Sequence, residues 1–230
     1  MNVAAIANID FAEKNKSLAY AVNVIGAENC ALAAKEIRSK YIWFSSDAVF
    51  SGDENCYDEN SVTNPKNYYG ETKLLGENRI IKANPDAIIL RLSLILGVSA
   101  NRGNSTFSQI LTQLKAGEIT KASTIEIRTP IYVGTLCDAI FELFSKNYKG
   151  ILNLGSTSSA SRYDIAKRIA VCEGYPESLI EPINGADPKK APRHVNGIID
   201  VSKALSVLSE TRLYTWQETV DLALKNKEEK

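Results

Sequence analysis

The side chains best suited to chemistry are a tyrosine, a lysine and a serine in the first third of the chain. Tyr69 and Lys73 stand four residues apart on a predicted helix, and this spacing puts both on one helix face. A tyrosine phenol has a pKa of about 10, and a nearby ammonium lowers that pKa because it favours the phenolate. Ser46 closes a predicted strand. Together the three side chains could donate a proton to a carbonyl oxygen.

The spacing of Tyr69 and Lys73 is a weak signal on its own. The sequence contains 10 tyrosines, and about one tyrosine followed four residues later by a lysine is expected by chance. Tyr163 and Lys167 form a second such pair. No strand-end hydroxyl precedes this second pair at a similar distance, and its helix carries apolar residues at core spacing. We therefore interpret the second pair as structural.

Alternating helix-like and strand-like segments predict an α/β fold with a mostly parallel sheet. The strand at 41–44 would carry Ser46 to the carboxyl edge of the sheet, where open α/β sheets bind ligands. Shorter strands in the last third indicate a smaller C-terminal lobe. The other expected strands are 87–92, 131–133 and 151–154, and the expected helices are 17–40, 69–83, 105–116, 135–146, 161–172, 202–208 and 215–225.

The composition argues against several classes of protein. Lys plus Arg and Asp plus Glu both number 27, so the chain lacks the basic excess that general nucleic-acid binding requires. No apolar run reaches the roughly 18 residues of a membrane helix. The 4 cysteines form no CxxC pair, which disfavours a metal site or disulfide framework and is typical of a reduced, cytoplasmic protein. The single histidine, His194, is interpreted as a loop residue.

Several motifs resemble those of extended short-chain dehydrogenases/reductases. The segment 45–52 (SSDAVFSG), the YGETK of 69–73 and the following Gly76-Glu77 are similar to the pattern STDYVFDG…YGxTKxxGE of dTDP-4-dehydrorhamnose reductases. Further matching motifs lie within 2–13, 23–29, 91–97 and 128–138, so the resemblance covers essentially the whole chain. It implies a Rossmann-like parallel sheet, truncated at its N-terminus, with a small C-terminal substrate-binding lobe.

The resemblance also implies an activity and its catalytic residues. The activity is that of a nucleotide-sugar reductase, which transfers hydride from NADPH or NADH to a 4-keto-6-deoxy sugar on a dTDP-like carrier. Tyr69 would protonate the ketone oxygen of the sugar. Lys73 would lower the pKa of Tyr69 and bind the nicotinamide ribose, and Ser46 would hydrogen-bond the substrate carbonyl.

Binding residues and domain limits follow from the same resemblance. Residues 1–97 would form part of an NAD(P)-binding region, and 98–230 mainly a substrate-binding lobe with Rossmann elements interleaved at about 131–154. Besides Tyr69 and Lys73, the cofactor would contact Ala4, Ala5 and Ser93. The substrate would contact Ser46, Asp47, Val49, Phe50 and Arg128. The arginine is a candidate for the diphosphate because its planar fork binds phosphate oxygens in pairs. No metal site is expected.

The sequence departs from the family pattern in one large respect. None of the 230 residues forms the GxxGxxG turn that binds the cofactor pyrophosphate, and the comparison implies that the first three strands and most of the fourth are absent. The strand at 41–44 would then be a bare sheet edge, which favours pairing with another chain. A smaller departure is Ala48, which stands where the family usually has tyrosine.

Several alternatives stay open at this point. The chain is a fragment of a normal reductase, a short protein that forms a homodimer across the bare edge, or a binding protein without cofactor chemistry. The same three catalytic side chains would also suit a nucleotide-sugar epimerase or dehydratase. A third function is that of a non-catalytic regulatory subunit, like the β subunit of methionine adenosyltransferase, which resembles the same reductases. We expect a nucleotide-sugar substrate and neither a nucleic-acid nor a membrane partner.

Overall fold

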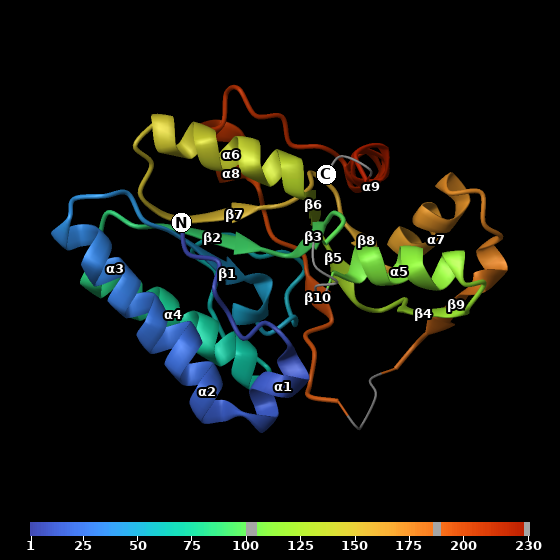
Figure 1. Cartoon of the computed structure of the whole chain (residues 1–230), viewed down its shortest axis with the longest axis horizontal. Helices are drawn as coiled ribbons and strands as arrows, with labels where there is room; N and C mark the ends of the chain where they lie inside the picture. The colour runs from blue at the N-terminus through green and yellow to red at the C-terminus, as the bar shows by residue number, and fades with distance from the viewer. Residues whose placement is uncertain (100–104, 186–189, 228–230) are drawn as a thin grey trace.

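A parallel sheet of three strands forms the centre of the larger of two lobes (Figure 1). The computed structural model describes residues 1–99, 105–185 and 190–227. The strand order is β1 (Ile42–Ser46), β2 (Ile88–Leu92) and β7 (Gly150–Leu154). Ile42 pairs with Ile88, and Ile88 pairs in turn with Gly150. All five residues of β2 are buried, as expected for a central strand of a sheet covered on both faces. The predicted Rossmann-like α/β class is confirmed.

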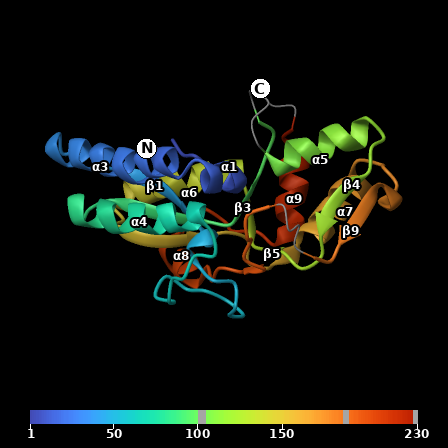
Figure 2. The ribbon, with the colours of Figure 1, turned by 90° about the horizontal axis from the view of Figure 1, so that it is seen from below.

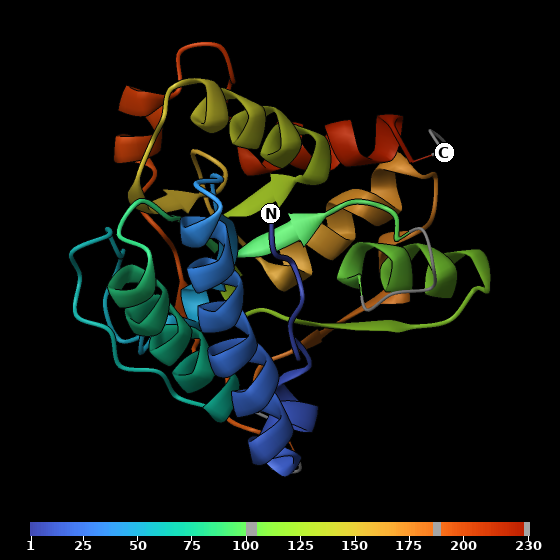
Figure 3. The same ribbon diagram turned by 60° about the vertical axis from the view of Figure 1, so that its left-hand side comes forward.

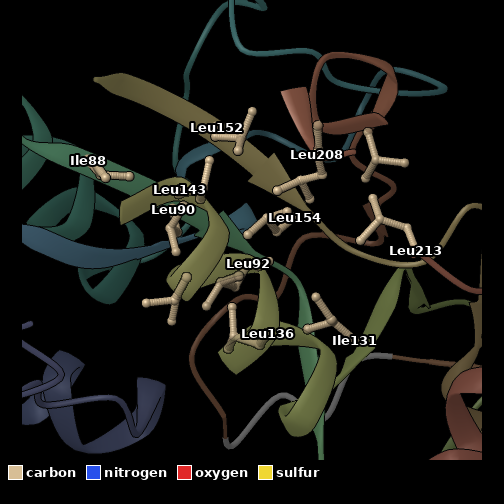
Figure 4. Packing of buried hydrophobic residues seen from close by; sticks show 14 of the residues in the cluster. Ile88, Leu90, Leu92, Ile131, Leu136, Leu143, Leu152, Leu154, Leu208 and Leu213 are labelled. Carbon is tan, nitrogen blue, oxygen red and sulfur yellow. The ribbon is translucent and has the colours of Figure 1, made fainter. Parts of the chain in front are cut away.

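Helices cover both faces of this sheet. On one face α3 (Ala27–Glu36) and α4 (Tyr68–Ala83) pack over a core that includes Trp43, Ile80 and Ile89. On the other face lie α6 (Val133–Ser145) and α8 (Ser202–Val207). Figure 4 shows the leucines of the sheet and of α6 interdigitating there. The burial of these apolar side chains is what holds the carboxyl ends of the strands in place.

The N-terminal helices depart from the single helix predicted for 17–40. The structure has α1 (Ile9–Lys14) and then α2 (Lys16–Tyr20), a π-helical stretch η1 (Ala21–Gly26) and α3. The helical run lies alongside α4 (Figure 3). It ends at Glu36 because Arg38 takes a left-handed conformation with φ of 54°. The π-helical stretch contains Asn23, whose side chain is completely buried.

The smaller lobe is built from short strands and three longer helices (Figure 2). Its helices bury a second apolar core, to which Phe107, Leu114 and Ile169 belong. The helices are α5 (Thr106–Lys115), α7 (Arg162–Cys172) and α9 (Trp216–Lys225), with a 3-10 turn η3 (Glu177–Leu179). The paired strands are β3 (Leu94–Leu96) with β6 (Pro130–Tyr132), β4 (Thr120–Ser123) with β9 (Ile180–Ile183), and β5 (Ile127–Arg128) between β8 (Ala160–Ser161) and β10 (Asn196–Gly197).

Strand β1 lies at one end of the three-stranded sheet, as the sequence predicted. Its outer carbonyl groups are nevertheless occupied. The backbone N–H of Asn2 donates to the oxygen of Ile42 over 2.8 Å, and Lys73 Nζ donates to the oxygen of Phe44 over 2.9 Å. The edge is therefore less bare than expected, and a homodimer across it stays a prediction.

Two further observations concern the part of the chain that the structure describes. No helix among these residues has both the length and the apolar character needed to cross a bilayer. Among the same residues, no three His, Cys, Asp or Glu side chains gather as metal ligands would.

Candidate active site

A cleft of about 800 Å³ opens where β1 and β2 end, and both lobes line it. From the sheet side it is lined by residues that the sequence singled out, Ser46, Asp47 and Tyr69, and by Ser93 just past β2. Arg128 of the smaller lobe faces the same cleft. Five of the predicted site residues thus meet around one cleft, although they come from distant parts of the sequence. The cleft lies at the carboxyl edge of the parallel sheet, where α/β proteins bind ligands.

Ser46 is positioned by the turn that follows its strand. It has extended backbone geometry and caps the 3-10 turn η2 (Asp47–Val49). Its Oγ accepts the backbone N–H of Ala48 over 3.2 Å and donates to Oδ1 of Asp47 over 3.0 Å. The hydroxyl is therefore oriented by two local partners before any ligand arrives.

Tyr69 reaches Ser46 because α4 begins very close to this turn. The side chain of Asn67 caps the helix by accepting the N–H of Gly70 over 2.9 Å. A Cβ atom added to Gly70 would lie 2.1 Å from the backbone oxygen of Ala48, so only glycine permits this approach. The first turn of α4 therefore places the Tyr69 phenol within hydrogen-bonding reach of Ser46.

The surroundings of Tyr69 raise the pKa of its phenol to about 12. Burial is the main cause, and the negative charge of Asp47 adds to it, while the hydrogen bond with Ser46 opposes both. The sequence led us to expect a lowered pKa from Lys73. That expectation does not hold in this structure, because loss of solvation outweighs the favourable neighbours of the phenolate.

Lys73 lies beneath the tyrosine, four residues along the same helix. Its Nζ is 4.4 Å from the centre of the Trp43 ring and 5.7 Å from that of Tyr69. Among the described residues, its one hydrogen bond goes to the backbone oxygen of Phe44. Burial lowers the pKa of Lys73 to about 8, although Glu77 opposes this shift. An ammonium group held in this way keeps two hydrogens for further acceptors.

Asp47 is the centre of a buried polar cluster on the floor of the cleft. Its Oδ2 accepts the Ser93 hydroxyl over 2.8 Å and lies 3.3 Å from His194 Nε2 and 3.6 Å from Arg128 Nε. Burial alone would raise the pKa of Asp47, but His194, Arg128 and Ser93 hold it at about 2. The carboxylate is consequently ionised at neutral pH, and hydroxyl donors hold both of its oxygens, Ser46 at Oδ1 and Ser93 at Oδ2.

Arg128 is more enclosed than a freely available phosphate ligand would be. One terminal nitrogen donates to the backbone oxygens of Ile127 and Val195, and the other donates to Glu126 and to the oxygen of His194. The residue is 7% exposed. In this structure Arg128 braces the segment around His194, and its contact with a diphosphate stays a prediction.

Besides Lys73, four predicted binding residues do not line the cleft. The side chains of Val49 and Phe50 are completely buried in a small core with Tyr57. They therefore do not offer their side chains to a ligand in this structure. Ala4 is exposed and Ala5 partly exposed on the segment that crosses the edge of the sheet, and their neighbours Val3 and Ala7 reach the cleft.

The side chain of Asn23, for which the sequence indicated no role, holds that N-terminal segment. The side-chain oxygen of Asn23 accepts the backbone N–H of Ile6 over 2.8 Å, and the side-chain N–H donates to the backbone oxygen of Ile6 over 3.1 Å. The Asn23 amide also donates to Thr72 Oγ1 over 3.0 Å. It thereby ties the segment to α4. An asparagine inside a helical run was the available signal, because asparagine is unfavourable there unless its side chain has partners.

His194 is a second residue whose place at the cleft the sequence did not reveal. It lies in a loop, as interpreted, but the loop is folded inward, so the residue is 4% exposed and lines the cleft beside Asp47. No local pattern indicates this, because the segment that carries it comes from the far end of the chain. Tyr163 and Lys167, the second tyrosine–lysine pair, are not among the residues that line the cleft, and Lys167 forms an ion pair with Glu177. Their structural role stays a prediction.

Comparisons with known proteins agree with this geometry. The profile of the RmlD substrate binding domain matches residues 1–229. The probable low-salt glycan biosynthesis reductase Agl14 of Haloferax volcanii is 31% identical over 206 residues, which span 88% of this chain and 69% of that protein. The dTDP-4-dehydrorhamnose reductase of Mycolicibacterium smegmatis is 29% identical over 230 residues, 97% of this chain and 69% of that protein.

Solved structures show the same relationship. The dTDP-4-dehydrorhamnose reductase of Bacillus anthracis, crystallised in complex with NADP, superposes with a TM-score of 0.89 at 27% sequence identity. The superposition covers 97% of this chain and 79% of that one. Together with the profile match over nearly its whole length, these likenesses show that the chain belongs to the family of the RmlD substrate binding domain.

Proposed function

We propose that this protein is a nucleotide-sugar reductase that uses NAD(P)H to reduce a 4-keto-6-deoxy sugar on a dTDP-like carrier. One observation carries the proposal: Ser46 and Tyr69 line a cleft shared by both lobes, and the Lys73 ammonium lies 5.7 Å from the centre of the Tyr69 ring. The relatives named dTDP-4-dehydrorhamnose reductase support the choice of substrate.

Tyr69 is the general acid in this proposal. Its pKa of about 12 keeps the phenol protonated at neutral pH, so the proton is available when negative charge develops on the carbonyl oxygen. Ser46 contributes a second hydrogen bond to that oxygen. Tyr69 gives its proton to the oxygen, the ketone becomes a hydroxyl, and the phenolate recovers a proton from solvent.

Residues near the catalytic side chains fit the nicotinamide end of the cofactor. Lys73 is buried with one hydrogen-bond acceptor among the described residues, so its remaining hydrogens suit the hydroxyls of a ribose. Ser93 lines the cleft, and Ala4 and Ala5 lie on the segment beside it. When bound, NAD(P)H supplies the hydride that adds to the carbonyl carbon. The 230 residues contain no GxxGxxG turn, and we assign none of them to the pyrophosphate.

The smaller lobe supplies the charge that a nucleotide diphosphate requires. Arg128, Arg162 and Arg193 line the cleft, and Glu126 forms ion pairs with Arg128 and Arg162. Arg162 is the more accessible, with 36% of its side chain exposed compared with 9% for Arg128. We keep Arg128 as the inner ligand of the diphosphate and place Arg162 at the entrance.

The matched pair of variants Tyr69→Phe and Tyr163→Phe tests the proposal. We expect Tyr69→Phe to lower kcat at least about 100-fold, since general acid catalysis contributes about 10²–10⁴-fold. Tyr163→Phe, the same change in the second tyrosine–lysine pair, should stay near wild type. The assay follows NADPH consumption with dTDP-4-keto-6-deoxy sugar. More than a tenth of the wild-type rate in Tyr69→Phe would rule out this residue as the acid.

Product analysis separates the reductase from the related enzymes. A reductase consumes one NAD(P)H for each alcohol formed. An epimerase or dehydratase changes the sugar with no net consumption of NAD(P)H. Sugar conversion without oxidation of the added cofactor would therefore overturn the proposed function.

A further inference from the structure

The imidazole of His194 is buried, and the part of the chain that the structure describes gives it no hydrogen-bond partner. The residue is 4% exposed, and neither ring nitrogen makes a hydrogen bond with the described residues. Buried polar atoms without partners are rare in native proteins and call for an explanation. Oδ2 of Asp47 lies 3.3 Å from Nε2. A small rotation of the ring would complete a hydrogen bond between these two atoms.

The backbone keeps His194 and Asp47 next to each other. A Cβ atom on Gly197 would lie 2.5 Å from Asp47 Oδ2 and 2.8 Å from His194 Nε2. A Cβ atom on Gly52, which has φ of 81°, would lie 2.8 Å from the His194 Cβ. Both glycines therefore leave just enough room for the imidazole. Arg128 holds the backbone of His194 by donating to its oxygen over 3.2 Å.

Asp47 connects His194 with the catalytic hydroxyl. While Oδ2 faces His194, Oδ1 accepts the hydroxyl hydrogen of Ser46 over 3.0 Å. A serine hydroxyl has only one hydrogen. In this structure Ser46 gives it to Asp47, so the substrate carbonyl and the carboxylate compete for the same donor.

We propose that His194 is a positioning residue for the reduction: by donating Nε2–H to Asp47, it weakens the hold of the carboxylate on Ser46 and lets that hydroxyl turn to the substrate carbonyl. This inference rests on the proposed function. A carboxylate whose charge is shared among more donors is a weaker acceptor for each of them. The charge of Asp47 also opposes formation of the Tyr69 phenolate, because it adds to the effect of burial in raising the pKa of Tyr69.

His194→Leu and His194→Gln test the role in turnover. Leucine removes the donor, and glutamine keeps an amide N–H near the position of Nε2. We expect His194→Leu to lower kcat about tenfold, the effect of one hydrogen bond to a charged group, with KM for the nucleotide sugar within about twofold of wild type. Glutamine should restore most of kcat.

Two kinetic outcomes would overturn the inference. A raised KM with unchanged kcat would make His194 a direct ligand of the substrate. Equal losses of kcat in both variants, together with equally lowered melting temperatures, would make it a purely structural residue. Absence of turnover in the wild-type protein would count against the proposed function and not against His194 alone.

A measurement without substrate or cofactor tests the contact itself. The chain has a single histidine, so its ring signals in nitrogen–proton NMR spectra need no assignment by mutagenesis. We expect the hydrogen on Nε2 in the wild-type protein and a changed Nε2–H signal in Asp47→Asn. A hydrogen on Nδ1, or a signal unaffected by Asp47→Asn, would overturn the inference whatever the activity of the protein.

Discussion

Replacement of Glu77 by glutamine is expected to destabilise the protein strongly, although the two side chains have nearly the same shape. Glu77 lies on the face of α4 that also carries Tyr69 and Lys73, and it is 1% exposed. Its two oxygens accept Nε and Nη2 of the buried Arg91 over 2.9 and 2.7 Å. The Ser45 hydroxyl donates to the same carboxylate. Glutamine would place an amide N–H against the N–H groups of the Arg91 guanidinium. It would also remove the negative charge that balances Arg91.

The magnitude follows from burial on both sides of the pair. Arg91 is 3% exposed, so solvent cannot replace the lost carboxylate. Breaking a buried ion pair by removing one partner costs about 3–5 kcal/mol. That is a large part of the roughly 5–15 kcal/mol that stabilises a typical protein. For a chain of this length the melting temperature should fall by about 6–20 °C.

Urea denaturation followed by circular dichroism measures the free energy of unfolding. The exposed pair of Asp86 and Lys149 provides a matched control, and Asp86→Asn should change that free energy by less than about 1 kcal/mol. Adding Arg91→Met to Glu77→Gln should restore much of the loss, because no unpaired charge then remains buried. A loss below about 1 kcal/mol in Glu77→Gln alone would refute this reasoning.

Three further predictions concern the site and its supports. Asp47→Asn should cost about 2 kcal/mol at neutral pH, because the pKa of Asp47 is about 2 compared with 3.8 for a free side chain. This stability is fully present above pH 3.8 and is lost as the pH falls through about 2. The free energies of unfolding of the wild type and of Asp47→Asn, measured against pH, should therefore converge at acid pH. A difference that stays constant with pH would contradict the assignment. Gly70→Ala should cost about 1–3 kcal/mol through collision with the Ala48 oxygen and should lower kcat, as denaturation and turnover assays will report. Thr215→Ala should cost about 1 kcal/mol in thermal unfolding, because the side chains of Thr215 and Glu218 form a capping box at the start of α9.

The elements predicted correctly are those with strong local patterns. The buried strands β1, β2 and β7 appear where branched apolar runs indicated them, and α4, α5, α6, α7 and α9 follow the spacing of apolar residues. The pairing of β4 with β9 was not foreseen. Their residues Thr120 and Ile180 lie 180 − 120 = 60 positions apart, and such short strands have too few residues for a periodic pattern.

Local order along the chain was enough to bring part of the site together. Ser46 closes a strand, and Tyr69 and Lys73 share one face of the next long helix, so the sequence by itself determined the chemical types at the cleft and the family they resemble. It also determined the α/β class, because segments with the apolar spacing of helices alternate with short apolar runs typical of buried strands, and few other architectures have this order.

Only the tertiary structure decided how strongly each side chain acts. Whether burial or a neighbouring ammonium controls the pKa of Tyr69 depends on solvent exclusion by distant segments, and burial prevails. His194 meets Asp47 although 194 − 47 = 147 positions separate them. Arg128 turns its guanidinium toward backbone oxygens of that same returning segment. Such contacts follow from chain folding in three dimensions, because no spacing within a single helix or strand encodes them.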